Sequence, residues 1–168
     1  MVKTNYPVKT AVLGMGNLLL KDEGVGVHIA QALQETPLPY RAELEVIDGA
    51  TSPDVFLLLK ETDKLVVIDA VQAGGEPGAI YRFRPEDVES EEEVVISAHQ
   101  TNLLENLKLL GQLEEAPKDI VIIGIQPKDT DWGLELSAEL QQRIPDIVKV
   151  VLNEVGLNRP DKREKGEK

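Results

Sequence analysis

Four side chains that could do chemistry stand where predicted strands end or a predicted helix begins. Glu23 follows a short apolar run, Asp48 closes the segment ELEVID, and Asp69 closes LVVID. His99 lies near the start of the segment SAHQTNLLENL. One Glu, one Asp and one His form a mixed oxygen and nitrogen set, which suits a borderline divalent metal such as nickel or zinc and leaves positions open for another ligand.

Two of these residues keep a second interpretation. An unpaired carboxylate at the edge of a dry core is costly, so an Arg, a helix N-terminus or a metal should neutralise Asp69. Otherwise its carboxylate caps the following turn. A helix N-terminus disfavours the imidazolium form, which keeps His99 neutral and able to bind metal; otherwise His99 is a surface residue. For His28, inside a predicted helix, we expect packing or surface exposure.

The loop GMGNLLLKDEGVG, residues 14–26, begins like a dinucleotide-binding turn and then departs from it. Leu19 stands where the third glycine of that motif would fall. The acids Asp22 and Glu23 would repel a pyrophosphate. These departures argue against a nucleotide-binding, Rossmann-like module, which we keep as the rival interpretation. The favoured interpretation is a loop that presents a carboxylate.

The remaining residues of this loop have predicted structural tasks. Gly14 and Gly16 permit a tight exit from the strand. Asn17 is expected to hold the loop through hydrogen bonds between its side chain and the backbone. Gly24 and Gly26 are expected to let the first helix pack close to the sheet.

Strand and helix patterns alternate along the chain. Strands are predicted at residues 8–14, 43–48, 65–70 and 119–125, and helices at residues 24–34, 51–61, 97–110 and 134–155, the last kinked or broken at Pro145. This order predicts an α/β sheet covered on both faces. Residues 78–84 follow the preceding strand too closely for a parallel crossover, so they should form an antiparallel strand. If the first strand is central, the acids at the strand ends converge on one crevice.

Composition narrows the class of protein. The 168 residues suffice for one domain, which we expect over residues 1–157, followed by a charged, disordered tail at 158–168. A net charge of −12 argues against nucleic acid as a partner. The absence of cysteine excludes disulfides and thiolate chemistry. With neither a signal-peptide pattern nor a membrane-spanning run, the expected location is the cytoplasm, away from the membrane.

Taken together and in order, several segments resemble the hydrogenase maturation endopeptidases. They are LGMGNLLLKDEGVGVHIAQAL, VIDGAT, LVVIDAV followed by GGEPG, and SAHQTNLLENL. The resemblance covers roughly residues 10–155. It implies a three-layer α/β/α sandwich on a five-stranded mixed sheet with one antiparallel strand, in agreement with the antiparallel assignment of residues 78–84.

The resemblance also implies an activity and its residues. Such enzymes remove a C-terminal extension from the large-subunit precursor of a [NiFe] hydrogenase after nickel insertion. The family's metal-binding positions fall on Glu23, Asp69 and His99, and another functional acid falls on Asp48. The metal would be nickel supplied by the precursor, or another divalent metal in its place. The peptide bond would be cut by aspartic-type chemistry with Asp48 or Asp69 as base, or through polarisation by the metal.

The resemblance leaves two further questions open. The first is whether the protein is an enzyme at all, since a non-catalytic binding partner that has kept the fold is a third interpretation. If it is an enzyme, we expect it to act as a monomer on its large partner. Choice among hydrogenases should lie in exposed segments at residues 72–77, 85–97 and 126–133. The third segment holds Trp132, the only Trp of the chain. It either covers the start of the final helix or is an exposed anchor for a partner.

Overall fold

The computed structural model describes residues 8–38, 43–50, 59, 61–88, 105–114 and 116–157. The predicted helix at 51–61, the start of the helix at 97–110, His99 and the tail at 158–168 lie outside these residues wholly or in large part.

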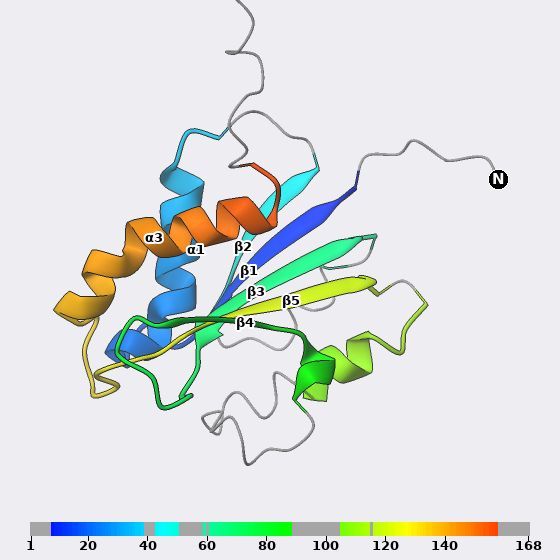
Figure 1. Cartoon of the computed structure of the whole chain (residues 1–168). Helices are drawn as coiled ribbons and strands as arrows, with labels where there is room; N and C mark the ends of the chain where they lie inside the picture. The colour runs from blue at the N-terminus through cyan, green and yellow to red at the C-terminus, as the bar shows by residue number, and fades with distance from the viewer. Residues whose placement is uncertain are drawn as a thin grey trace, which may run out of the picture.

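Five strands form one mixed sheet (Figure 1). They are β1 (Thr10–Met15), β2 (Leu44–Ala50), β3 (Lys64–Ala70), β4 (Ile80–Phe83) and β5 (Asp119–Ile125). The order is β2-β1-β3-β5-β4, and all neighbours are parallel except β4 and β5. The expected five-stranded sheet with one antiparallel strand is therefore confirmed. The first strand lies between the next two, so the condition set for the strand ends to meet is fulfilled.

Apolar residues on alternate positions of the strands build two cores. One core lies under α1 (Val25–Glu35) and α3 (Ala138–Glu154), which cover the same side of the sheet in Figure 1. It contains Val66 and Ile68 of β3. The other core contains Leu65 and Val67 of β3, together with side chains of the helical residues 105–110. Helices thus cover both faces, as the alternating pattern predicts.

The final helix begins later than expected. It starts at Ala138 with Ser137 as its N-cap, so residues 134–137 belong to the preceding loop. Leu136 lies four residues before Leu140 and so continues the apolar period of α3, but the chain turns away from the helix there because the carboxylate of Asp22 holds Ser137. Pro145 lies inside α3 and does not end it. This proline is exposed, so the missing backbone hydrogen bond leaves its carbonyl partner near water.

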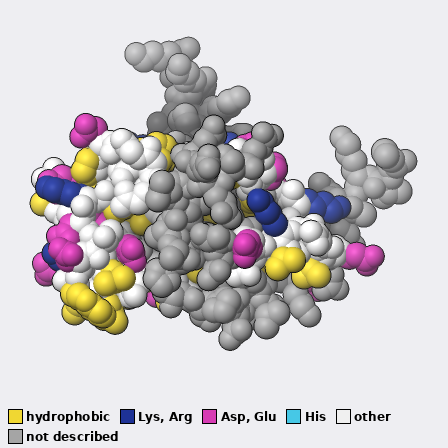
Figure 2. Space-filling model, turned by 90° about the horizontal axis from the view of Figure 1, so that it is seen from below, with side chains coloured by type: hydrophobic (Ala, Val, Ile, Leu, Met, Phe, Trp, Pro, Cys, Tyr) yellow, Lys and Arg dark blue, Asp and Glu magenta, His cyan; other side chains and the backbone are white. Residues whose placement is uncertain are grey.

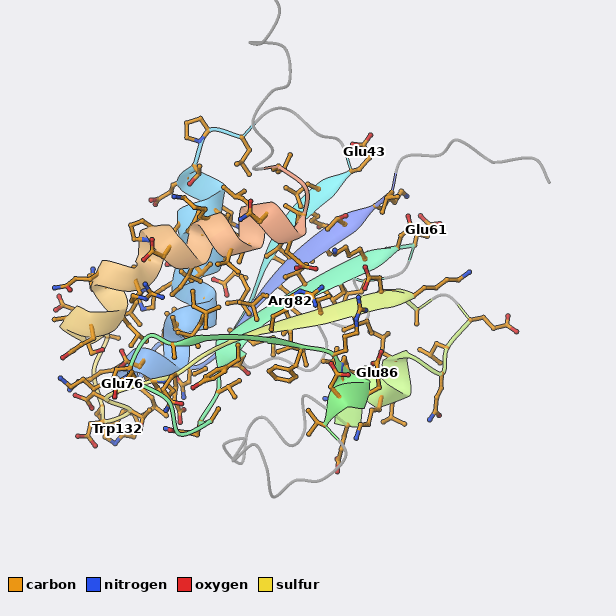
Figure 3. The ribbon with its side chains drawn as sticks, viewed as in Figure 1. Glu43, Glu61, Glu76, Arg82, Glu86 and Trp132 are labelled. Carbon is orange, nitrogen blue, oxygen red and sulfur yellow. The ribbon has the colours of Figure 1, made fainter. Side chains whose placement is uncertain are left out.

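An ion-pair network fastens the end of α3 to the sheet. Glu154 accepts hydrogen bonds from Lys64 Nζ at 3.0 Å and from Arg82 Nε at 2.8 Å, so it joins the start of β3 to β4. The Arg82 and Lys64 cations lower the pKa of the Glu154 carboxyl to about 2, against the opposing effect of burial. Arg82 is labelled in Figure 3 on the short edge strand β4.

Among the described helices, none is both long enough and apolar enough to cross a membrane.

Candidate active site

The carboxyl ends of β1, β2 and β3 meet at one edge of the sheet. The chain leaves β1 through the 3-10 helix η1 (Lys21–Gly24) and α1, and β2 and β3 lie on opposite sides of β1. Ligands of open α/β sheets bind at such a place, where the connections diverge. Glu23 lies in η1, Asp48 near the end of β2 and Asp69 near the end of β3. The backbone positions of the three predicted acids are therefore brought to this edge.

Asp69 is a nearly buried carboxylate, with 7% of the residue exposed. Its Oδ1 accepts a hydrogen bond from the backbone N–H of Ala70 at 2.8 Å. Strand alternation places it on the same face as Leu65 and Val67, at the end of the second core. A carboxylate at the end of a core is partly shielded from water, which strengthens its interaction with nearby charges.

The loop that carries Glu23 rests directly on the strand ends. A Cβ on Gly16 would lie 2.0 Å from the carbonyl oxygen of Glu23, and the φ of Gly16 is +136°. A Cβ on Gly26 would lie 2.1 Å from the carbonyl oxygen of Ile68, the residue before Asp69. Only glycine permits these two approaches. The half-buried Glu23 and the strand end at Asp69 are thus parts of one close-packed backbone arrangement.

The expected tasks of the loop residues are mostly confirmed. Asn17 Oδ1 accepts a hydrogen bond from the N–H of Leu19 at 2.9 Å. Gly26 lies where α1 packs against the sheet, as expected. Gly14 was expected to permit the exit from the strand, but it faces Gly26 and Ala30 of α1 instead, and the positive φ at the exit belongs to Gly16. Gly24 is different: a Cβ there would meet the backbone of Asn17 and Leu18, so it packs against the loop and not against the sheet.

Asp48 occupies a different setting from Asp69. It is exposed, and its Oδ1 accepts a hydrogen bond from the N–H of Ala50 at 3.2 Å. Ala50 has a positive φ of 43°, and the register between β1 and β2 shifts at this point. Asp48 shares its strand face with Leu44 and Val46, which pack on the α1 side, whereas Asp69 lies on the opposite face. The strand ends converge as expected, but these two carboxylates extend from opposite faces of strands about 10 Å apart.

His99, the expected nitrogen ligand, lies outside the described residues. The helical residues 105–110 that follow it in sequence contribute Leu107 and Leu110 to the second core, on the face of the sheet that bears Asp69. Within the described part of the chain, no three acids or histidines are close enough to hold a metal ion.

The sequence reasoning missed the role of Asp22. This residue is fully buried, and its carboxylate accepts four hydrogen bonds. The donors are the N–H groups of Lys128 and Asp129, both at 2.9 Å, and the N–H and hydroxyl of Ser137, at 2.7 and 2.8 Å. Asp22 therefore fixes the loop after β5 to the helix η1 that carries Glu23. No short-range pattern could reveal this, because the partners lie more than 100 residues later.

His28 packs beneath the same loop. Burial lowers the pKa of its imidazole, while a hydrogen bond with the backbone of Leu134 opposes that shift. Its Nε2 is buried and has no hydrogen-bond partner among the described residues. These contacts agree with the expected packing role.

An α/β fold with a mixed five-stranded sheet and acids at its topological switch point defines a class of proteins with a site at the sheet edge. Comparison with known proteins narrows this class. The family model described as hydrogenase maturation protease, HycI, matches residues 27–154. The chain therefore belongs to the hydrogenase maturation proteases, a family of peptide hydrolases.

Individual relatives agree with this family. The hydrogenase expression/formation protein HupD of Thiocapsa roseopersicina is 35% identical over 145 residues, which cover 84% of this chain and 65% of that protein. The hydrogenase maturating endopeptidase HybD from E. coli has a similar structure, with a TM-score of 0.75 and 29% identity over 89% of this chain and 94% of that one. The [NiFe] hydrogenase maturation protease HybD from Thermococcus kodakarensis has a TM-score of 0.70 and 28% identity, covering 88% and 99% of the two chains.

Proposed function

We propose that this protein is an endopeptidase that removes the C-terminal extension of a [NiFe]-hydrogenase large-subunit precursor after nickel has been inserted. Family membership supports the reaction class. The observation that carries the proposal is the nearly buried Asp69, which is the second-last residue of β3 and follows Ile68, whose carbonyl lies against the backbone of α1. A carboxylate so placed can recognise a cation that the substrate brings.

Recognition of the metal is assigned to Glu23, Asp69 and His99. In this proposal nickel belongs to the substrate, so the enzyme would test whether the precursor is loaded before cleaving it. Another divalent metal in the precursor could take the place of nickel. Glu23 is half-buried and Asp69 is nearly buried, so water is partly excluded around both. Weak hydration strengthens the attraction between carboxylates and a cation.

Cleavage is assigned to a carboxylate general base, with Asp48 and Asp69 as the two candidates. Their settings suggest different tasks. Asp48 is exposed to solvent, whereas Asp69 is nearly buried and accepts a hydrogen bond from the backbone N–H of Ala70. We therefore assign general acid–base work to Asp48 and the orientation of the cation-bearing end of the substrate to Asp69.

The rival functions receive less support from the described contacts. Asp22 and Glu23 occupy the part of the loop where a pyrophosphate would need backbone N–H groups. A non-catalytic partner would bind the precursor and never shorten it. The proposed setting is the cytoplasm, with a monomeric enzyme and without nucleic acid or membrane as partner.

The deciding experiment compares two forms of the precursor. Purified protein is incubated with nickel-loaded and nickel-free precursor, and the precursor mass is followed by mass spectrometry. Only the loaded form should lose its extension. Equal cleavage of both forms would refute nickel recognition, and binding without cleavage would favour the non-catalytic partner.

Single substitutions then test the assignments. Glu23→Gln, Asp69→Asn and His99→Ala should each abolish processing of the loaded precursor, while Glu45→Gln, at an exposed position of β2, should not. Urea unfolding of each variant separates lost chemistry from lost stability. If Asp69→Asn folds but is inactive, the assignment to the site stands. If Asp69→Asn fails to fold, the turn-capping role of that carboxylate is favoured.

A further inference from the structure

Three large apolar side chains project into solvent beside the loop that carries Glu23. Trp132 is 79% exposed, Leu134 is 66% exposed and Leu19 is 51% exposed. We call these three residues the Trp132 surface. Figure 3 places Trp132 at the left-hand end of the molecule, and Figure 2 shows exposed hydrophobic side chains gathered at the same end. The expectation that Trp132 covers the start of the final helix is therefore wrong, since its ring lies in water.

Backbone pairing brings together the two segments that carry these three side chains. Leu20 and Gly133 form a parallel bridge between two loops that lie far apart in sequence. The N–H of Lys21 donates to the carbonyl of Gly133, and the N–H of Gly133 donates to the carbonyl of Leu19, both at 2.9 Å. Leu19 therefore lies beside the segment that carries Trp132 and Leu134.

Polar contacts beneath the surface hold it in place. Lys21 Nζ and Asp129 Oδ2 form an ion pair at 2.6 Å, and the Lys21 hydrogen bond lowers the pKa of the Asp129 carboxyl. The N–H of Asp22 donates to the carbonyl of Asp129 at 3.0 Å, in addition to the four bonds that the Asp22 carboxylate accepts. The apolar side chains are thus carried by a well-bonded loop. Little conformational freedom remains to be lost on binding, which favours affinity.

Acidic side chains border the Trp132 surface. Asp131 and Glu135 flank it in sequence, and both are exposed. In the part of the chain that the structure describes, neither forms an ion pair, although neighbouring Asp129 does. An aromatic anchor inside a charged rim is typical of protein interfaces. The complementary surface is an apolar patch edged by Lys and Arg.

We propose that the Trp132 surface docks the folded body of the large-subunit precursor, so that its cleavable extension reaches Glu23 and Asp69. This inference rests on the proposed function. The Trp132 surface is continuous with the loop that bears Glu23, because Lys21, which pairs with Gly133, and Glu23 belong to the same four-residue helix η1. A protein whose peptide reaches Glu23 must therefore lie against or beside the Trp132 surface.

The test compares substitutions of exposed apolar residues inside the Trp132 surface with one substitution outside it. Trp132→Ser and Leu134→Ser remove the anchor, and Leu113→Ser is the matched control, because Leu113 is 63% exposed and lies outside the Trp132 surface. Processing is measured at limiting and at saturating concentrations of nickel-loaded precursor. For Trp132→Ser, kcat/KM should fall about 30-fold with kcat retained, as expected for loss of a dominant interface residue. Leu113→Ser should behave like the unsubstituted protein.

A direct readout uses the single Trp of the chain. Protein labelled with 5-fluorotryptophan has one ¹⁹F signal, which should shift when nickel-loaded precursor is added and less so at high salt. If the unsubstituted protein cleaves but Trp132→Ser keeps its kcat/KM and the signal does not move, the docking inference fails and the proposed function stands. If the signal moves without any cleavage, docking stands and the proposed function fails. A signal that moves with protein concentration alone identifies a contact between copies and overturns the inference.

Discussion

The substitution Asp22→Asn probes the link between the two loops of the site. The carboxylate of Asp22 accepts one hydrogen bond at Oδ1, from the N–H of Ser137, and three at Oδ2. An amide has one oxygen and one nitrogen. Even in the better orientation, with its oxygen in place of Oδ2, the amide nitrogen faces the N–H of Ser137. One bond then becomes a contact between two donors, and the other three lose the negative charge.

The expected loss of stability follows from these contacts. A hydrogen bond to a charged group contributes about 1.5–3 kcal/mol, and a neutral one about 1 kcal/mol. Because the loop lies near the surface, water can satisfy part of what is lost. We therefore expect Asp22→Asn to lower the free energy of unfolding by about 3 kcal/mol. For a domain of this size, that corresponds to a fall in Tm of roughly 6–12 °C.

Urea unfolding and hydrogen exchange measure the effect. Ser137→Ala removes a single hydroxyl bond to the charged carboxylate and should cost about 1.5 kcal/mol. Asp131→Asn, at an exposed acid of the same loop, should change stability by less than about 0.5 kcal/mol. Exchange of the N–H groups of Lys128 and Asp129 should accelerate in Asp22→Asn. A loss below about 1 kcal/mol, with unchanged exchange of these groups, would show that the four contacts are not what holds the loop.

Three further outcomes are expected. Because the folded-state pKa of Glu154 is about 2, its contribution of about 1–3 kcal/mol is complete above the ordinary Glu pKa and is lost as the pH falls toward 2. Glu154→Gln should therefore flatten the urea stability profile between pH 5 and 2, and an unaltered slope would contradict this. Gly26→Ala drives a Cβ into backbone oxygens of β1 and β3 and should cost about 3 kcal/mol or more, whereas Gly111→Ala, with only ordinary contacts, should be nearly neutral. In an NMR titration, His28 should show a pKa below 6.5 because it is buried; a value above 6.5 would refute that packing.

The sheet could be predicted from sequence because its signals are local. The run from Asp119 to Ile125 is uniformly apolar after its first residue, and its predicted bounds agree with β5. The antiparallel direction of β4 followed from the short connection after β3. The acids at strand ends could be found in the same way, since a carboxylate closing an apolar run is visible in the sequence itself.

Long-range contacts could not be predicted in this way. The four bonds to Asp22, the bridge between Leu20 and Gly133, and the exposure of Trp132 all depend on how the two loops meet in space. Sequence periodicity carries no information about such pairings. The late start of α3 could not be predicted for the same reason. It depends on the hydrogen bond from Ser137 to Asp22, a residue far away in the sequence.

The edge strand β4 limits how other chains can associate with the sheet. β4 has four residues, is the last strand in the order, and is enclosed by Pro77 and Pro85 in sequence. Its exposed Arg82 is committed to Glu154. Short length, charge and neighbouring prolines are the features that keep an edge strand from pairing with a strand of another protein. A substrate peptide is therefore not expected to extend the sheet at β4.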